Sequence, residues 1–129
     1  MSIRQVIKTD AAPAAIGPYS QAIVAGGMLH CSGQISIDPK TGELIDGDIT
    51  AQAEQVLTNL GAVLSAAGSS FDQVIKCNVY LTDMANFAAV NEVYARYFTS
   101  DDPPARACVA VHQLPKLVLV EIDCIALVD

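Results

Sequence analysis

Basic residues are few in this sequence and form no cluster. Its 129 residues contain 7 Lys and Arg against 14 Asp and Glu, which gives a net charge of −7. Nucleic acids and anionic membranes are bound through concentrated positive charge, so neither is an expected partner. No apolar run approaches the roughly 20 residues of a membrane-spanning helix, and Met1 to Gln5 lack a signal-peptide pattern. We therefore expect a cytoplasmic protein.

Metal-ligating residue types are also sparse. The cysteines follow neither a CxxC nor a zinc-binding spacing, and the two histidines, His30 and His112, are far apart in the sequence. Each cysteine falls in an apolar, strand-like run, which is typical of buried free thiols. The sequence therefore gives little support to a metal site. The four cysteines are Cys31, Cys77, Cys108 and Cys124.

Charged residues make up only 16% of the chain, whereas hydrophobic residues make up 52%. A chain of 129 residues is large enough to bury a core unaided. We find no internal repeat, low-complexity tract or linker, and we expect a single domain over residues 1–129. So little charged surface favours an oligomer with apolar interfaces.

The hydrophobic pattern predicts an α+β fold. Apolar residues at helical spacing predict a helix over Ile49–Ala67, with Asp48 as N-cap, and a second over Met84–Phe98, with Asp83 as N-cap. A strand, a helix and a further strand suggest a crossover between parallel strands. We expect one mixed sheet with two helices on one face, and a partner subunit over the open face. The expected strands are 3–7, 19–25, 28–34, 74–81, 104–111 and 117–127.

Two charged residues, Arg106 and Glu121, lie inside apolar alternating runs, where an unpaired charge is costly. The short link between the last two strands predicts antiparallel neighbours, with Arg106 and Cys108 beside Glu121 and Asp123. The pair could be a structural ion pair. Alternatively, the planar fork of Arg106 could bind a carboxylate while Glu121 handles a water or proton. The residues alone leave both interpretations open and slightly favour the ion pair.

The other candidate site residues also have both a functional and a structural interpretation. Gly33 could admit a ligand to the backbone beside the Ser32 hydroxyl, but a bulge or bend is the simpler interpretation. Asn91 points with the apolar stripe of its helix and either bonds a backbone group or lines a pocket. Tyr19 could cap a pocket or belong to an interface. Cys108 is a poor nucleophile, because acids on the expected neighbouring strand would raise its thiol pKa.

Several motifs occur together from one end of the chain to the other. They are Ala14-Ala15-Ile16-Gly17-Pro18-Tyr19-Ser20-Gln21-Ala22, Ser32-Gly33-Gln34, Asp38-Pro39-Lys40-Thr41-Gly42, Asn91 with Tyr94 and Phe98, Pro104-Ala105-Arg106-Ala107-Cys108, Leu114-Pro115-Lys116 and Val120-Glu121-Ile122. In combination they resemble the Rid (YjgF) family, specifically its RidA-type 2-iminobutanoate/2-iminopropanoate deaminases. No single tripeptide among them would be specific.

This resemblance implies a fold like that of monofunctional chorismate mutase and a homotrimer with three sites between subunits. The implied activity is hydrolysis of 2-imino acids, or their enamine tautomers, to 2-oxo acids and ammonia, without a cofactor. Arg106 would bind the substrate carboxylate, and Glu121 would position or activate the attacking water. The residues that the resemblance places around the substrate are Tyr19, Ser32, Gly33, Asn91 and Cys108.

Three other functions remain open. A chaperone-like holdase trimer could act through apolar surfaces without Arg106 chemistry. A ribonuclease or translation inhibitor would need Lys and Arg clusters for phosphate contacts, which a net charge of −7 opposes. A ring-opening hydrolase acting on a related enamine could use the same site.

Overall fold

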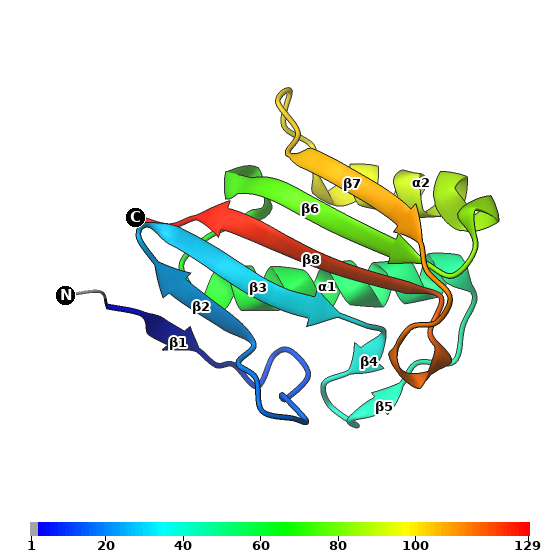
Figure 1. Cartoon of the computed structure of the whole chain (residues 1–129), viewed down its shortest axis with the longest axis horizontal. Helices are drawn as coiled ribbons and strands as arrows, with labels where there is room; N and C mark the ends of the chain where they lie inside the picture. The colour runs from blue at the N-terminus through cyan, green and yellow to red at the C-terminus, as the bar shows by residue number, and fades with distance from the viewer. Residues whose placement is uncertain (1–2) are drawn as a thin grey trace.

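The computed structural model describes residues 3–129 and contains a six-stranded sheet with two α-helices (Figure 1). Met1 and Ser2 lie outside the described residues. They belong to the segment in which no signal-peptide pattern was found. No helix in the described part of the chain has the length and apolar character needed to cross a membrane. The elements are β1 (Gln5–Ile7), β2 (Ala22–Ala25), β3 (Met28–Gln34), β4 (Ile37–Asp38), β5 (Glu43–Leu44), α1 (Ile49–Ala66), β6 (Val74–Leu81), α2 (Phe87–Tyr97), β7 (Ala105–Ala110) and β8 (Val120–Leu127).

The strand order in the main sheet is β1-β2-β3-β8-β6-β7, and β4 and β5 form a separate small hairpin. Among the strands of residues 3–129 only β6 and β7 pair in parallel, and α2 connects them as a crossover helix. The predicted crossover through α1 also joins two strands of the same direction, β3 and β6, but β8 lies between them and is antiparallel to both. The predicted α+β class, a mixed sheet with two helices on one face, is confirmed.

The prediction that the last two strands are neighbours is wrong. β6 lies between β7 and β8 (Figure 1), so Arg106 pairs with Cys77, and Cys77 in turn pairs with Cys124. The connection is longer than the expected four-residue link, because β7 ends at Ala110 and β8 begins at Val120. Such a segment can span roughly 30 Å when extended, which is ample to pass a strand about 4.8 Å wide.

The helices form where their local signals predict. The Asp48 side chain accepts a hydrogen bond from the Ala51 amide at 3.0 Å and caps α1, and Gly68 follows its end with a φ of 75°. The second helix is shorter than expected, because Met84–Asn86 forms a 3-10 turn before α2. Asp83 caps that turn by accepting from the Ala85 amide at 2.9 Å.

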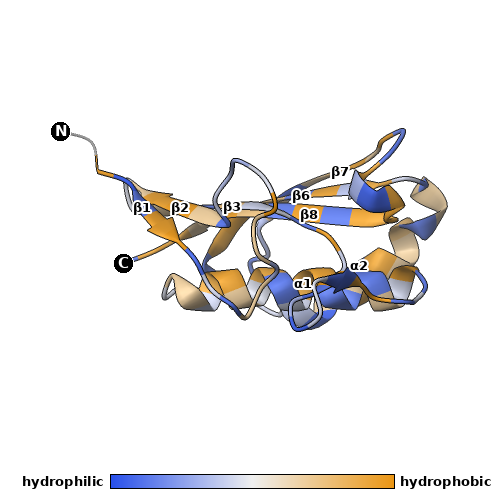
Figure 2. Cartoon of the chain, turned by 90° about the horizontal axis from the view of Figure 1, so that it is seen from below, coloured by the Kyte–Doolittle hydropathy of each residue, from blue (hydrophilic) through white to orange (hydrophobic). Residues whose placement is uncertain are grey.

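One face of the sheet packs on the helices, and within residues 3–129 no element covers the other (Figure 2). On β8 the buried positions alternate with half-buried ones, so Ile122 and Cys124 face the helices while Glu121 and Asp123 face away. The open face also carries exposed apolar side chains, among them Val6. The four cysteines are free; Cys108 is half-buried and the other three are buried, as predicted.

Candidate active site

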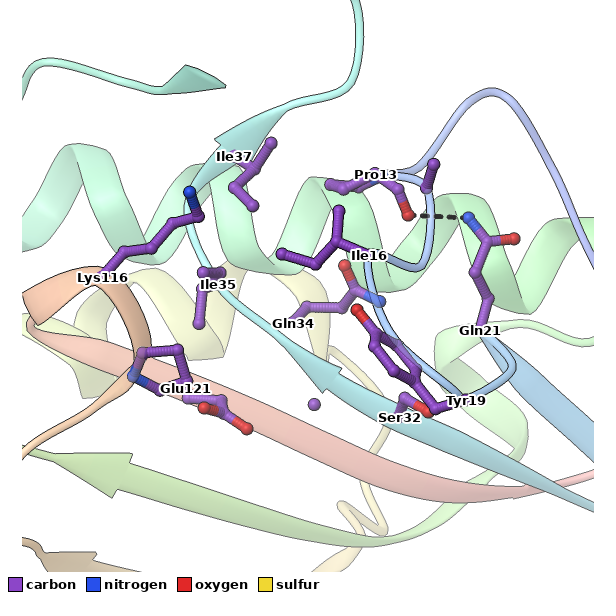
Figure 3. A pocket seen from close by; sticks show the side chains of 13 residues that line it. Pro13, Ile16, Tyr19, Gln21, Ser32, Gln34, Ile35, Ile37, Lys116 and Glu121 are labelled. Atoms are coloured by element: carbon purple, nitrogen blue, oxygen red, sulfur yellow. Dashed lines mark hydrogen bonds between the residues drawn. The ribbon is translucent and has the colours of Figure 1, made fainter. Parts of the chain in front are cut away.

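The predicted site residues lie in two groups on different parts of the molecule. Tyr19, Ser32, Gly33 and Glu121 line a cavity of about 440 Å³, which we call the Glu121 cavity. Figure 3 shows Lys116 and Glu121 on one side of this cavity and Tyr19 on the other.

The second group surrounds Arg106. Asn91 and Arg106 line a cavity of about 520 Å³ between α2 and the segment that enters β7, which we call the Arg106 cavity. Cys108 follows Arg106 on the same face of β7 and lines neither cavity. The two cavities have no lining residue in common.

The register explains the separation of Arg106 from Glu121. Arg106 pairs with Cys77, which is fully buried beneath the helices, so the guanidinium is on the helix-covered face. Glu121 pairs with Tyr80 and points to the open face. Because paired residues in adjacent strands project to the same face, one chain holds these two groups on opposite sides of its sheet.

Gly33 leaves the space that the Glu121 carboxylate occupies. A Cβ atom at Gly33 would lie 2.0 Å from Glu121 Oε2 and 2.9 Å from its Cδ. The β3–β8 register shifts between Cys31 and Gln34, so the predicted irregularity at Gly33 is confirmed. Sequence reasoning missed the contact with Glu121, because it joins two strands far apart in the chain.

The carboxyl group of Glu121 is half-buried beside a second acid. Burial raises the pKa of Glu121 above the ordinary carboxyl range, and the negative charge of Asp123 raises it further. A carboxylate with a raised pKa is a stronger base than an exposed one, which suits it to accept a proton from water.

The loop before β2 closes one side of the Glu121 cavity. β2 begins at Ala22, so Tyr19 precedes the strand that was expected to begin there. The Ser32 hydroxyl donates to the Ser20 carbonyl at 2.6 Å, and the buried Gln21 amide donates to the Pro13 carbonyl at 2.8 Å. The loop is therefore tied down on both sides of Tyr19. Gln21 was not singled out from the sequence, since nothing local marks a buried amide at a strand start.

Lys116 enters the same cavity from a strained turn. Lys116 and Leu117 both have positive φ values, 55° and 59°. For residues other than glycine this left-handed conformation costs about 1–2 kcal/mol each. Lys116 belongs to the motif that carried the family resemblance, but no role was predicted for it. Its place on the wall of the Glu121 cavity marks it as a further candidate.

Arg106 is held in a fixed orientation. Its guanidinium donates to Asn91 Oδ1 at 2.7 Å and lies over the rings of Tyr94 and Phe87, 4.8 and 5.5 Å from their centroids. Within residues 3–129 the one salt bridge joins Arg96 to Glu54, so the structural ion pair of Arg106 and Glu121 is excluded within a chain. Asn91 lines a cavity and orients the arginine, rather than bonding a backbone group.

Cys108 lacks the environment of a nucleophilic thiol. Desolvation raises its pKa, and the nearby charge of Arg106 only partly opposes this. The cause first inferred, acids on the adjacent strand, is wrong, since the neighbour of β7 is β6. Among the described residues, no group of three His, Cys, Asp or Glu side chains is arranged to hold a metal ion.

The fold and the sequence place this chain in a known class of protein. The family model described as "Endoribonuclease L-PSP" matches residues 9–128, and the chain belongs to this family. A RutC family protein of Pyrococcus horikoshii is 57% identical over 96% of this chain and 98% of its own. The 2-iminobutanoate/2-iminopropanoate deaminase of Capra hircus is 48% identical over 96% and 90%.

Solved structures agree with the sequence relatives. A Yersinia pestis protein, described as a member of the conserved Rid protein family and of unknown function, is 49% identical. It superimposes with a TM-score of 0.95 over 98% of this chain and 100% of its own. The predicted membership of the Rid family, with its chorismate-mutase-like fold, is thereby confirmed.

Proposed function

We propose that this protein hydrolyses reactive 2-imino acids and their enamine tautomers, such as 2-iminobutanoate and 2-iminopropanoate, to 2-oxo acids and ammonia. The observation that carries the proposal is an oriented arginine without a carboxylate partner among the described residues, in a chain with a net charge of −7. Such a group suits a small anionic substrate. The Capra hircus relative, named a 2-iminobutanoate/2-iminopropanoate deaminase, supports the substrate class.

Arg106 binds the substrate carboxylate in this proposal. Asn91 and the two aromatic rings beneath the guanidinium fix its plane before substrate arrives, so little side-chain entropy is lost on binding. A charge-assisted hydrogen bond of this kind contributes about 1.5–3 kcal/mol. The anchored carboxylate then sets the position of the imine carbon, which is bonded directly to the carboxylate carbon.

Glu121 positions the attacking water and accepts its proton. The water oxygen bonds to the electrophilic imine carbon, and the resulting aminoalcohol receives the proton on nitrogen. The C–N bond then breaks and ammonia leaves with its electron pair, while Glu121 accepts the hydroxyl proton and the carbonyl of the 2-oxo acid forms. Tyr19, Ser32 and the backbone at Gly33 line this side of the site. The family resemblance adds a substrate contact from the backbone at Cys108, which follows Arg106 on the same face of β7.

Both groups can act on one substrate only if two chains supply them, because each chain holds them on opposite faces of its sheet. We therefore place the site between the subunits of a cyclic, cytoplasmic homotrimer, with Glu121 from one subunit and Arg106 from the next. Exposed apolar side chains on the open face, such as Met28 and Val109, support its burial against a partner.

Mixing two inactive variants tests the activity and the shared site together. Arg106→Ala and Glu121→Gln should each reduce ammonia release to a small residual rate, with the imines generated in a coupled dehydratase assay. When equimolar chains are unfolded and reassembled together, about one site in four pairs an intact Glu121 with an intact Arg106. About a quarter of the wild-type activity should therefore return.

A site within one chain would recover nothing, since every chain in the mixture lacks one of the two residues. Full activity of Arg106→Ala would contradict the substrate-binding role. Arg96→Ala provides the matched control: it removes an exposed arginine from α2 together with its salt bridge to Glu54, outside both cavities. This control should keep its activity.

RNA cleavage is a second candidate because the matching family is described as an endoribonuclease. The net charge of −7 argues against it, since phosphate contacts need concentrated basic side chains. We expect no steeply salt-dependent RNA binding in a filter or fluorescence assay. Such binding, if it also survived Arg106→Ala, would favour the nuclease.

A further inference from the structure

The open face beside Glu121 carries a second carboxylate, Asp123, held by two neutral donors. Its Oδ1 accepts from Asn78 Nδ2 at 2.9 Å, and its Oδ2 accepts from the Tyr80 hydroxyl at 3.1 Å. Both donors belong to β6, where Asn78 pairs with Asp123 and Tyr80 pairs with Glu121. The four side chains thus form one block across two adjacent strands.

These contacts fix the position of the Asp123 carboxylate and place no positive charge beside it. Neutral donors stabilise an ionised carboxylate but leave its negative charge in place. Asp123 and Glu121 are two positions apart on the same face of β8, which sets their backbones about 6.6 Å apart. The fixed charge of Asp123 therefore acts on Glu121 across a half-buried surface.

The directions of the pKa shifts of the neighbouring groups follow from this geometry. Burial raises the pKa of Glu121, and Asp123 adds to that increase. Burial also raises the pKa of Tyr80, followed by the effects of Asp123 and Glu121, so its phenol stays a donor at neutral pH. The titratable groups around Glu121 come from the loop before β2, from β6, from the β7–β8 connection and from β8 itself. They are Tyr19, Tyr80, Lys116 and Asp123.

We propose that Asp123, anchored by Asn78 and Tyr80, is a positioning residue whose fixed negative charge keeps Glu121 basic enough to take the proton of the attacking water. This inference rests on the proposed imine hydrolysis. Asp123 lines neither cavity, so its effect on the reaction would pass through Glu121.

Asp123→Asn removes the charge while preserving the shape and the hydrogen bond with Asn78. We expect the Glu121 carboxyl, followed by carbon-13 NMR, to titrate about one pH unit lower in this variant. The acidic limb of the pH profile of kcat/KM should move by the same amount. Above that limb kcat should fall a few-fold because a weaker base accepts the proton, whereas KM should stay unchanged because Arg106 is untouched.

Three further variants make this result specific. Asp72→Asn changes the net charge equally from an exposed position in the turn before β6, and should move neither the titration nor the limb. Asp123→Glu restores the charge and should return the limb toward the wild-type position. Tyr80→Phe removes only one anchor and should give a smaller shift in the same direction, which keeps the test available if Asp123→Asn fails to fold.

An unchanged Glu121 titration in Asp123→Asn would overturn the inference, as would an equal shift in Asp72→Asn. A shifted titration with an unmoved acidic limb would also overturn it, since Asp123 would then have no effect on the reaction. If the wild-type chain hydrolyses no imine, the proposed function fails instead, and the NMR titration still decides whether Asp123 acts on Glu121.

Discussion

A methyl group added at Gly33 would occupy the space of the Glu121 carboxylate. The new Cβ would lie 2.0 Å from Oε2, 2.9 Å from Cδ and 3.2 Å from Cγ. Ordinary contact begins near 3.4 Å, so the carboxylate oxygen must move by more than an ångström. The Gly33 backbone has no positive φ, and alanine therefore adds no backbone strain.

Gly33→Ala should accordingly damage catalysis far more than stability. The Glu121 side chain can swing aside at a cost of about 0.5–1.5 kcal/mol, so the melting temperature should fall by only a few degrees. A base misplaced by an ångström costs roughly 100-fold in rate, or about 2.7 kcal/mol of barrier. Ammonia release in the coupled dehydratase assay, measured as kcat/KM, should show that loss.

A double-mutant cycle links this loss to Glu121. In a Glu121→Gln background the carboxylate base is already absent, so Gly33→Ala should cost almost nothing more. Gly61→Ala is the control for crowding alone, since its Cβ would lie 2.9 Å from the Phe71 ring, outside both cavities. It should alter stability and leave kcat unchanged. Wild-type kcat/KM in Gly33→Ala would refute the argument.

Further variants test the other groups. Glu121→Gln should raise the melting temperature at pH 7 and leave only a residual activity. Because the pKa of Glu121 is raised in the folded state, the stability that its protonated form gives is present below the ordinary carboxyl pKa and is lost as the pH rises through the folded-state pKa. The gain in melting temperature from Glu121→Gln should therefore disappear near pH 3. Asn91→Ala frees the Arg106 guanidinium and should raise KM about tenfold with a smaller change in kcat; an unchanged KM would show that the hydrogen bond does not orient Arg106. Tyr94→Phe should be tolerated, because the buried hydroxyl has no hydrogen-bond partner among the described residues. Tyr94→Leu removes the ring beneath Arg106 and should raise KM. Equal KM values in the two variants would contradict the role of the ring. Cys108→Ser should keep most of the activity, and a complete loss would restore the thiol as a nucleophile.

Local signals accounted for the two helices and for the strands of the main sheet, but not for the β4–β5 hairpin, which lies in a segment whose sequence is typical of a turn and loop. The apolar spacing and the caps Asp48 and Asp83 act over one or two helical turns, and both helices form where these signals lie. The strand predicted over residues 74–81 has the bounds of β6, since its alternation matches one buried and one open face. Family motifs then identified the candidate residues, because they specify residue types at fixed positions.

The order of the strands and the division of the site were decided by the tertiary structure. Alternation within a strand places Glu121 and Asp123 on one face and Arg106 with Cys108 on one face, and the sequence determined both pairs. It could not show that β6 would separate β7 from β8, because strand pairing depends on packing between segments far apart in the chain. The same long-range packing places Glu121 over Gly33 and turns Arg106 to the opposite face.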